Sequence, residues 1–139
     1  MDIEDTSTED YGWGTGTAVI KRKDLKVTAE EAKRTKGEVV RAVAFARTCL
    51  ANNNYKGLRG YFIEIKSQAL WGKTRIEDIN SWIKIRNASH TALDLLMVYF
   101  DQYPHEDNVG LLQRWRQRSL QVKVGALLDL MQKEISKTF

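Results

Sequence analysis

The chain contains a single proline, Pro104, among its 139 residues. Proline interrupts helices and is common in the turns that join short strands, so its near absence favours long uninterrupted helices over a turn-rich β architecture. Hydrophobic residues make up 42% of the chain and charged residues 29%, which is enough apolar material for one ordinary core. We therefore expect an all-α protein with a single helical domain.

The clearest local signal is a helix start at Thr28-Ala29-Glu30-Glu31. Thr-x-x-Glu is the pattern of a capping box, and acidic residues in the first turn favour the positive end of the helix dipole. Apolar residues at helical spacing then continue to Leu50, which predicts a helix over 29–51. Asparagine tolerates the left-handed conformation that follows a helix, so Asn52-Asn53-Asn54 are expected to end it.

The middle of the chain continues the helical periodicity. Apolar residues predict a second helix over 56–70, ended by Gly72, and a third from 75 to about 86. A dense apolar stripe then runs over 92–100, and Tyr103-Pro104 closes it, because proline pushes the preceding residue out of helical conformation.

Two positions leave the number of helices open. Residues 87–91 either break the chain or lie inside one long helix. In the last third, one helix bends near Gly125 or two helices meet around Ser119. We expect a compact bundle of five or six helices over 28–139, preceded by a flexible N-terminal arm over 1–27.

The arm is acidic at its start and basic at its end, where Lys21, Arg22, Lys23 and Lys26 lie. Residues 1–10 carry five of the 18 acidic residues and none of the 22 basic ones, so the remainder is more basic than the formal net charge of +4 indicates. An acidic tail on a basic body can fold back as a mock ligand. Glycines at alternate positions in 12–16 lack the strand and the Lys-Ser/Thr of a phosphate loop, and are expected to form a flexible tether.

Side chains that carry out catalysis are few. Cys49 falls near the apolar stripe of the first predicted helix, where a lone cysteine is usually a small buried hydrophobe. His90 and His105 lie in predicted loop positions, and neighbours such as Ser89 and His90 rarely face each other as nucleophile and base. The sequence has no His-x-x-x-His, Cys-x-x-Cys or clustered acidic loop. We therefore expect a non-enzymatic protein with no cofactor and no metal.

The most informative segment is basic and aromatic. It contains no acidic residue from Val109 to Leu128 and carries four cations: Arg114, Arg116, Arg118 and Lys123. Positions 114 and 118 are one helical turn apart, so this row can contact successive phosphates, while the glutamines of the run offer hydrogen bonds to sugar or phosphate oxygens. Lys33, Arg34 and Lys36 are expected to extend this surface, although ordinary solubility charges are the alternative.

Aromatic residues near this segment admit two interpretations. Trp115 can stack on a base, or it can be a core or interface anchor. Tyr99, Phe100 and Tyr103 are candidates for an oligomer interface, or they fill the core. A homo-oligomer is therefore possible but not specified by the sequence.

Four short motifs follow one another in the second half: Trp82, Tyr103-Pro104, Leu111-Leu112-Gln113-Arg114-Trp115 and Val124-Gly125-Ala126-Leu127-Leu128. This order resembles the death-domain superfamily of helical adaptor modules, which show a tryptophan, a helix ending near Tyr-Pro, a Leu-Leu-x-x-Trp helix and then a Val-Gly-x-Leu-Leu helix. The resemblance implies an adaptor that binds another protein.

Two functions follow from these observations. The first is sequence-nonspecific contact with the backbone of RNA or DNA through basic helix faces, within an oligomer or larger assembly. The second is a protein-interaction adaptor, in which the same cations meet an acidic protein surface. No apolar run approaches the ~20 residues that span a bilayer, and the acidic start is no signal peptide. We expect a soluble intracellular protein, cytoplasmic or nuclear, without a membrane partner.

Overall fold

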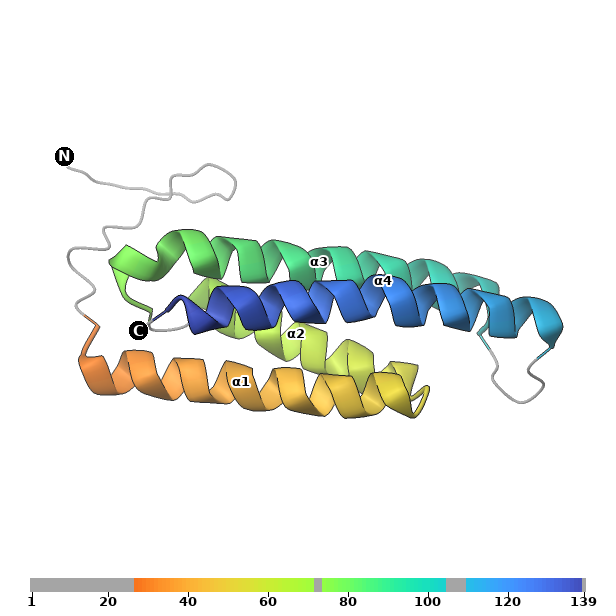
Figure 1. Ribbon diagram of the computed structural model, residues 1–139, viewed down its shortest axis with the longest axis horizontal. Coiled ribbons are helices and arrows are strands. Elements are labelled where there is room, and N and C mark those ends of the chain that lie inside the picture. Colours follow the sequence, from red (N-terminus) through yellow and green to blue (C-terminus); the bar gives the residue numbers. More distant parts are fainter. Residues whose placement is uncertain (1–26, 72–73, 105–109, 139) are drawn as a thin grey trace.

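The computed structural model describes residues 27–71, 74–104 and 110–138, without the side chains of residues 70 and 71. These ranges contain four α-helices and one short 3-10 helix: α1 (Ala29–Ala51), α2 (Tyr55–Trp71), η2 (Ile76–Asp78), α3 (Ile79–Gln102) and α4 (Leu111–Ser136). The helices run alternately up and down in an elongated bundle (Figure 1). Each packs on the next in sequence, and α4 closes the bundle against α1.

The all-α prediction is confirmed, whereas the prediction of five or six helices is wrong, since the described ranges contain four α-helices. The arm over 1–27 lies outside the described residues except for Val27. The expected flexibility of that arm stays a prediction.

The predicted start and end of α1 are both present. The Thr28 Oγ1 accepts a hydrogen bond from the Glu31 N–H at 3.0 Å, and the Thr28 N–H donates to the Glu31 carboxylate at 3.2 Å. Asn53 takes the left-handed conformation, with φ 55°, in the turn after α1. The side chain of Asn54 then accepts from the Gly57 N–H at 3.0 Å, which starts α2 immediately.

The α3 helix runs through residues 87–91 without a break. Ser89 donates from its hydroxyl to the Ile85 carbonyl, and Thr91 to the Asn87 carbonyl, each at 3.0 Å. Both hydroxyls therefore have an acceptor inside the helix, so the polar run is accommodated without a break. The helix ends at Gln102, two residues before Pro104, as the proline predicts.

The α4 helix is also continuous, across both Ser119 and Gly125. The two motifs that the death-domain pattern places on successive helices, 111–115 and 124–128, therefore lie on one helix. The structure does not support the resemblance.

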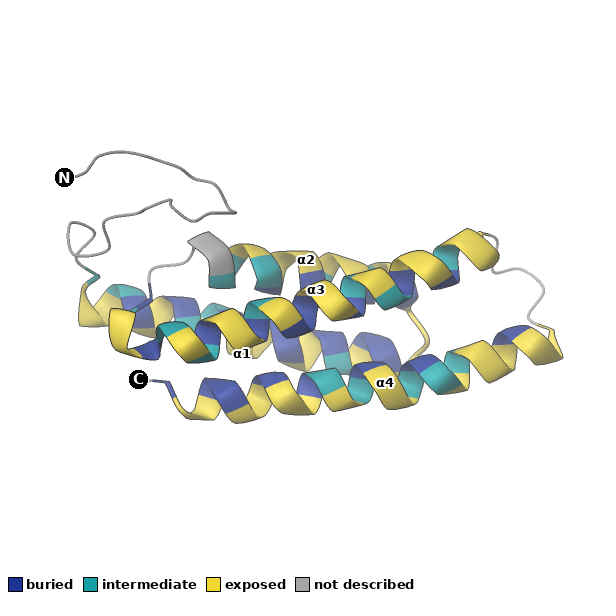
Figure 2. Ribbon diagram, turned by 90° about the horizontal axis from the view of Figure 1, so that it is seen from above, coloured by how far each residue is buried: buried dark blue, intermediate teal, exposed yellow. Residues whose placement is uncertain are grey.

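The core lies along the bundle axis, where all four helices contribute buried side chains (Figure 2). The largest fully buried aliphatic and aromatic ones are Tyr55, Phe62, Leu58, Ile65, Ile85, Leu96, Leu128, Met131, Val39, Val43 and Val124. Cys49 is buried beside them, as expected. Across the described helices, none combines the length and the apolar character that a membrane span requires.

Candidate functional site

Glutamines hold the first half of α4 against the rest of the bundle. The side-chain amides of Gln113 and Gln117 each donate to the Tyr99 hydroxyl at 2.9 Å. One turn further, the Gln121 amide donates to the Leu50 carbonyl and to the side chain of Asn53. All three amides thus donate inside the protein, and the expectation that glutamines of this segment contact sugar or phosphate stays a prediction.

This inward glutamine row leaves the basic side chains of α4 pointing outward. Arg114, Arg116, Arg118 and Lys123 are all exposed. None of the four forms an ion pair or a side-chain hydrogen bond with any residue that the structure describes. They are thus available to an external anion.

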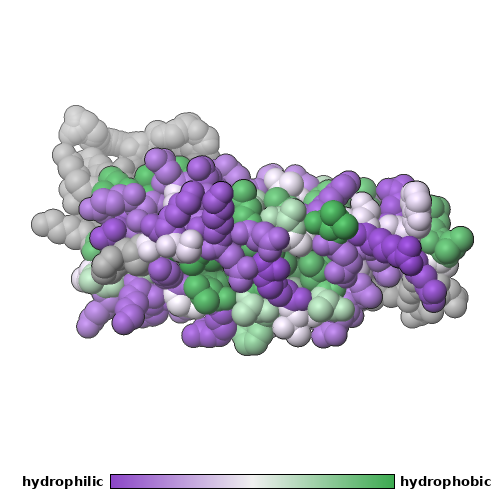
Figure 3. All heavy atoms as spheres, in the orientation of Figure 1, coloured by the Kyte–Doolittle hydropathy of each residue, from purple (hydrophilic) through white to green (hydrophobic). Residues whose placement is uncertain are grey.

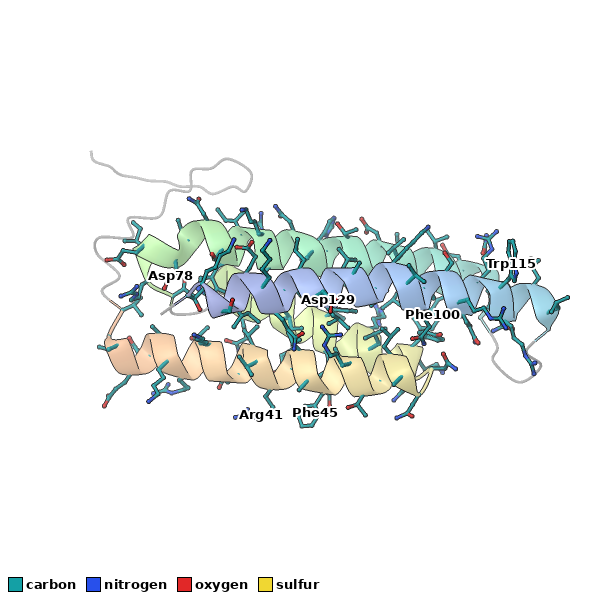
Figure 4. The ribbon with its side chains drawn as sticks, in the orientation of Figure 1. Arg41, Phe45, Asp78, Phe100, Trp115 and Asp129 are labelled. Atoms are coloured by element: carbon teal, nitrogen blue, oxygen red, sulfur yellow. The ribbon has the colours of Figure 1, made fainter. Side chains whose placement is uncertain are left out.

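An apolar stripe lies between these cations. Leu111, Trp115 and Val122 are 84%, 69% and 74% exposed, and their spacing of four and seven residues places them on one outward face of the helix. Figure 4 shows Trp115 at the outer surface near the start of α4. The prediction of Trp115 as a core residue is therefore wrong, whereas base stacking and interface contact stay open.

At 100° per residue, the cations flank the stripe on both sides. Arg114 and Arg118 lie on one side, whereas Arg116 and Lys123 lie on the other. We call this surface the basic α4 face; it consists of Arg114, Trp115, Arg116, Arg118, Val122 and Lys123. Strongly hydrophilic and apolar side chains lie next to one another at the end of the molecule where α4 begins (Figure 3).

The second half of α3 widens this surface on one side. Arg116 and Lys123 line a shallow hollow of about 140 Å³ together with Leu95, Val98 and Gln102. Val98 is 51% exposed there. The two cations thus line a hollow to which α3 contributes apolar side chains. The sequence did not predict this contact, because the pairing of α3 with α4 is not visible in the pattern of either segment.

The other predicted cations lie far from the basic α4 face. The Lys36 ammonium donates to the Thr138 carbonyl at 3.0 Å, which places the start of α1 beside the end of α4. Lys33 and Arg34 are exposed in the same region, and the helical rise puts them roughly 35 Å from Arg114 along the bundle. The expectation that these residues extend one continuous surface is wrong.

The predicted aromatic interface is largely internal. Tyr99 is 3% exposed, and its ring lies 5.0 Å from that of Tyr55 and 5.3 Å from that of Tyr103, measured between centroids. Phe100 and Tyr103 are half-buried and pack against the core. The prediction of Tyr99 as an interface residue is therefore wrong, because Tyr99 is part of the core and its hydroxyl accepts hydrogen bonds from the α4 glutamines.

A larger groove of about 680 Å³ lies between α2 and α3, and sequence reasoning did not foresee it. Its apolar lining includes Ile63, Leu93 and Met97. Across it, the Lys66 ammonium lies 3.0 Å from His90 Nδ1, while His90 Nε2 lies 3.5 Å from the Asp94 carboxylate. The cations and carboxylates of this groove partly neutralise each other, in contrast to the basic α4 face.

The neighbouring pair Ser89 and His90 point in different directions. Ser89 is completely buried, and its hydroxyl lies 3.9 Å from the sulfur of Met131, whereas His90 is exposed at the groove. They do not form a nucleophile and base.

No family model, no curated protein and no solved structure matches the chain. A function has to be inferred from the chemistry of its own residues, among which the basic α4 face is the most distinctive group.

Proposed function

We propose that the protein binds the backbone of single-stranded nucleic acid, without sequence preference, through the basic α4 face. The observation that carries the proposal is that four outward cations on one acid-free half-helix have no partner among the described residues. Phosphate oxygens are acceptors that such arginines bind well. Binding would take place in the cytoplasm or nucleus.

The position of Trp115 favours a single strand over a duplex. Its ring is exposed between two pairs of cations, so a base can stack on it while phosphates on either side meet the arginines. Stacking of this kind contributes about 1–3 kcal/mol per base and tolerates any sequence.

The proposal sets the expected salt dependence. Four phosphate contacts to a single strand give a slope of about −3 in the logarithm of the binding constant against the logarithm of salt. Affinity should then fall about fifty-fold between 50 and 200 mM salt.

Fluorescence anisotropy with labelled single-stranded RNA and DNA tests this directly. In the variant Arg114→Glu/Arg118→Glu, we expect affinity at 50 mM salt to fall more than about ten-fold, because two contacts become repulsive. The matched control is Lys33→Glu/Arg34→Glu, which changes net charge equally at the other end of the bundle. Equal losses in both variants, or no binding of the parent chain at 50 mM salt, would refute the proposal.

The exposed leucines favour a second candidate, docking of an acidic protein partner. Leu111 and Leu112 are 84% and 64% exposed, and large apolar side chains beside arginines are typical of protein interfaces. Leu111→Ala/Leu112→Ala separates the candidates: nucleic-acid affinity stays within about two-fold, since the leucines contact no phosphate, whereas binding of a protein partner is lost.

Assembly into an oligomer is a further part of the proposal. Its support is the same apolar stripe, which remains uncovered by the described residues. Light scattering coupled to size-exclusion chromatography decides it, and a monomer at high protein concentration, with and without nucleic acid, would remove this part.

A further inference from the structure

The acidic start of the chain and the basic α4 face carry opposite charges. Residues 2–13, here called the N-terminal segment, carry five acidic residues, no basic one, and the aromatic residues Tyr11 and Trp13. We propose that this segment docks on the basic α4 face and competes there with polyanions. The competition rests on the proposed function, whereas the docking does not.

The described cations favour α4 over the two other candidate surfaces. Lys33 and Arg34 share the first turns of α1 with Glu30 and Glu31, so the local charge is nearly balanced. The groove between α2 and α3 contains Asp94 and Asp101 together with its lysines. Among the described residues of the basic α4 face, every charged side chain is a cation.

The N-terminal segment and the basic α4 face also both contain large apolar side chains. The N-terminal segment places Tyr11 and Trp13 directly after its last acidic residues. Trp115 and Val122 are 69% and 74% exposed between the flanking arginines. Aromatic rings that cover this stripe would remove apolar surface from water while the carboxylates meet the guanidiniums.

The chain is long enough for this contact. Thr28 lies at the end of the bundle opposite to the start of α4, roughly 40 Å from Arg118 along the axis by the helical rise. The chain between Asp10 and Thr28 spans up to about 60 Å when extended. A tethered segment of this kind acts at an effective concentration that a separate peptide at micromolar concentration does not reach.

Paramagnetic relaxation in the full chain tests the docking without any nucleic acid. A nitroxide is attached at Ser7→Cys in a Cys49→Ser background whose thermal unfolding matches the parent. We expect the amide signals of 111–123 to weaken at low salt and to recover in 500 mM salt, while those of 33–36 stay unchanged. Arg114→Glu/Arg118→Glu should abolish the effect, whereas Lys33→Glu/Arg34→Glu should leave it.

Equal broadening at both cation clusters, or none at α4, would overturn the docking. Broadening that appears only between labelled and isotope-enriched copies in a mixed sample would also overturn it, because the segment would then reach a second copy.

Neutralising the segment tests the competition. The variant with Asp2→Asn, Glu4→Gln, Asp5→Asn, Glu9→Gln and Asp10→Asn should bind single-stranded RNA about three- to ten-fold more tightly at 50 mM salt, with a smaller gain at 200 mM. Its control neutralises five acids of the helices instead, namely Glu30, Glu38, Glu64, Glu77 and Asp101. An equal gain in the control, or no gain in the variant, overturns the competition. A chain that binds no RNA at all refutes the proposed function but leaves the relaxation result standing.

Discussion

The two halves of α4 pack on the bundle with different chemistry. In the second half, the inward positions Val124, Leu128, Met131 and Ile135 are buried apolar side chains. In the first half, the inward positions include Gln113 and Gln117, which bind the Tyr99 hydroxyl. Hydrocarbon burial therefore anchors one half, whereas hydrogen bonds act together with the buried Leu120 in the other.

This difference separates stability from the binding surface on a single helix. Hydrogen bonds between neutral groups contribute about 1 kcal/mol each, less than a fully buried leucine does. The first half is thus held in place largely by polar contacts on its inner side, which leaves its cations and its apolar stripe uncommitted. We therefore expect substitutions at the buried apolar positions of the second half to lower stability, and substitutions at the outward positions of the first half to leave stability nearly unchanged.

The largest expected effect is on the apolar half. Leu128→Ala should lower the free energy of unfolding by about 2–5 kcal/mol, because it leaves a cavity at a completely buried position. Leu112→Ala is the matched control on the polar half, where the leucine is 64% exposed, and should change stability by less than about 0.5 kcal/mol. Urea denaturation measures both, and similar losses would show that the two halves are packed alike.

The next effect tests the glutamine anchors. Tyr99→Phe removes the acceptor for both amides and leaves Gln113, which is 4% exposed, without its partner. We expect a loss of about 1–3 kcal/mol, with hydrogen-exchange protection lost mainly in 111–121. Tyr103→Phe, at a half-buried ring, is the control, and a uniform loss of protection along α4 would contradict the idea of separate anchors.

The helices that rest on local signals could be predicted from the sequence. The capping box at Thr28 and the asparagine turn after α1 are satisfied within a few residues, so their geometry follows from local chemistry. The continuity of α3 could not be predicted, because Ser89 and Thr91 suit a loop as well as a helix in which their hydroxyls bond to carbonyls one turn back. Polar residues in a row indicate a break as readily as a helix.

The candidate site was predictable in its charges but not in its orientation. Counting acids and bases identifies Arg114, Arg116 and Arg118. Which side of the helix turns inward is decided by Tyr99, on another helix, and by Leu50 at the end of α1. Lys36 was misplaced for the same reason, since only tertiary packing brings α1 beside the end of α4.

A smaller effect, dependent on pH, is expected at the end of the apolar half. Burial raises the pKa of Glu134, but hydrogen bonds from Lys137 and Ser81 and the charges of Lys137 and Lys84 outweigh it, so the pKa lies below its ordinary value of 4.5. A lowered carboxyl pKa stabilises the fold above about pH 4.5, and this contribution is lost as pH falls through the folded-state pKa.

Glu134→Gln should therefore destabilise the protein at pH 7 and converge with the parent at low pH. Thermal unfolding from pH 7 to pH 3 measures this, with Glu64→Gln, an exposed position on α2, as the control for net charge. A difference that does not vary with pH would mean that the side chain acts by shape alone.

A small effect on stability should accompany a clear loss of binding at Trp115. Because its ring is 69% exposed, Trp115→Ala should change the free energy of unfolding by less than about 0.5 kcal/mol. The loss of one stacked base should weaken binding of single-stranded nucleic acid by about 1–3 kcal/mol. Denaturation and anisotropy on the same preparation check both values. A destabilised Trp115→Ala variant would mean that the polar half of α4 also relies on apolar packing, which would remove the distinction between the two halves.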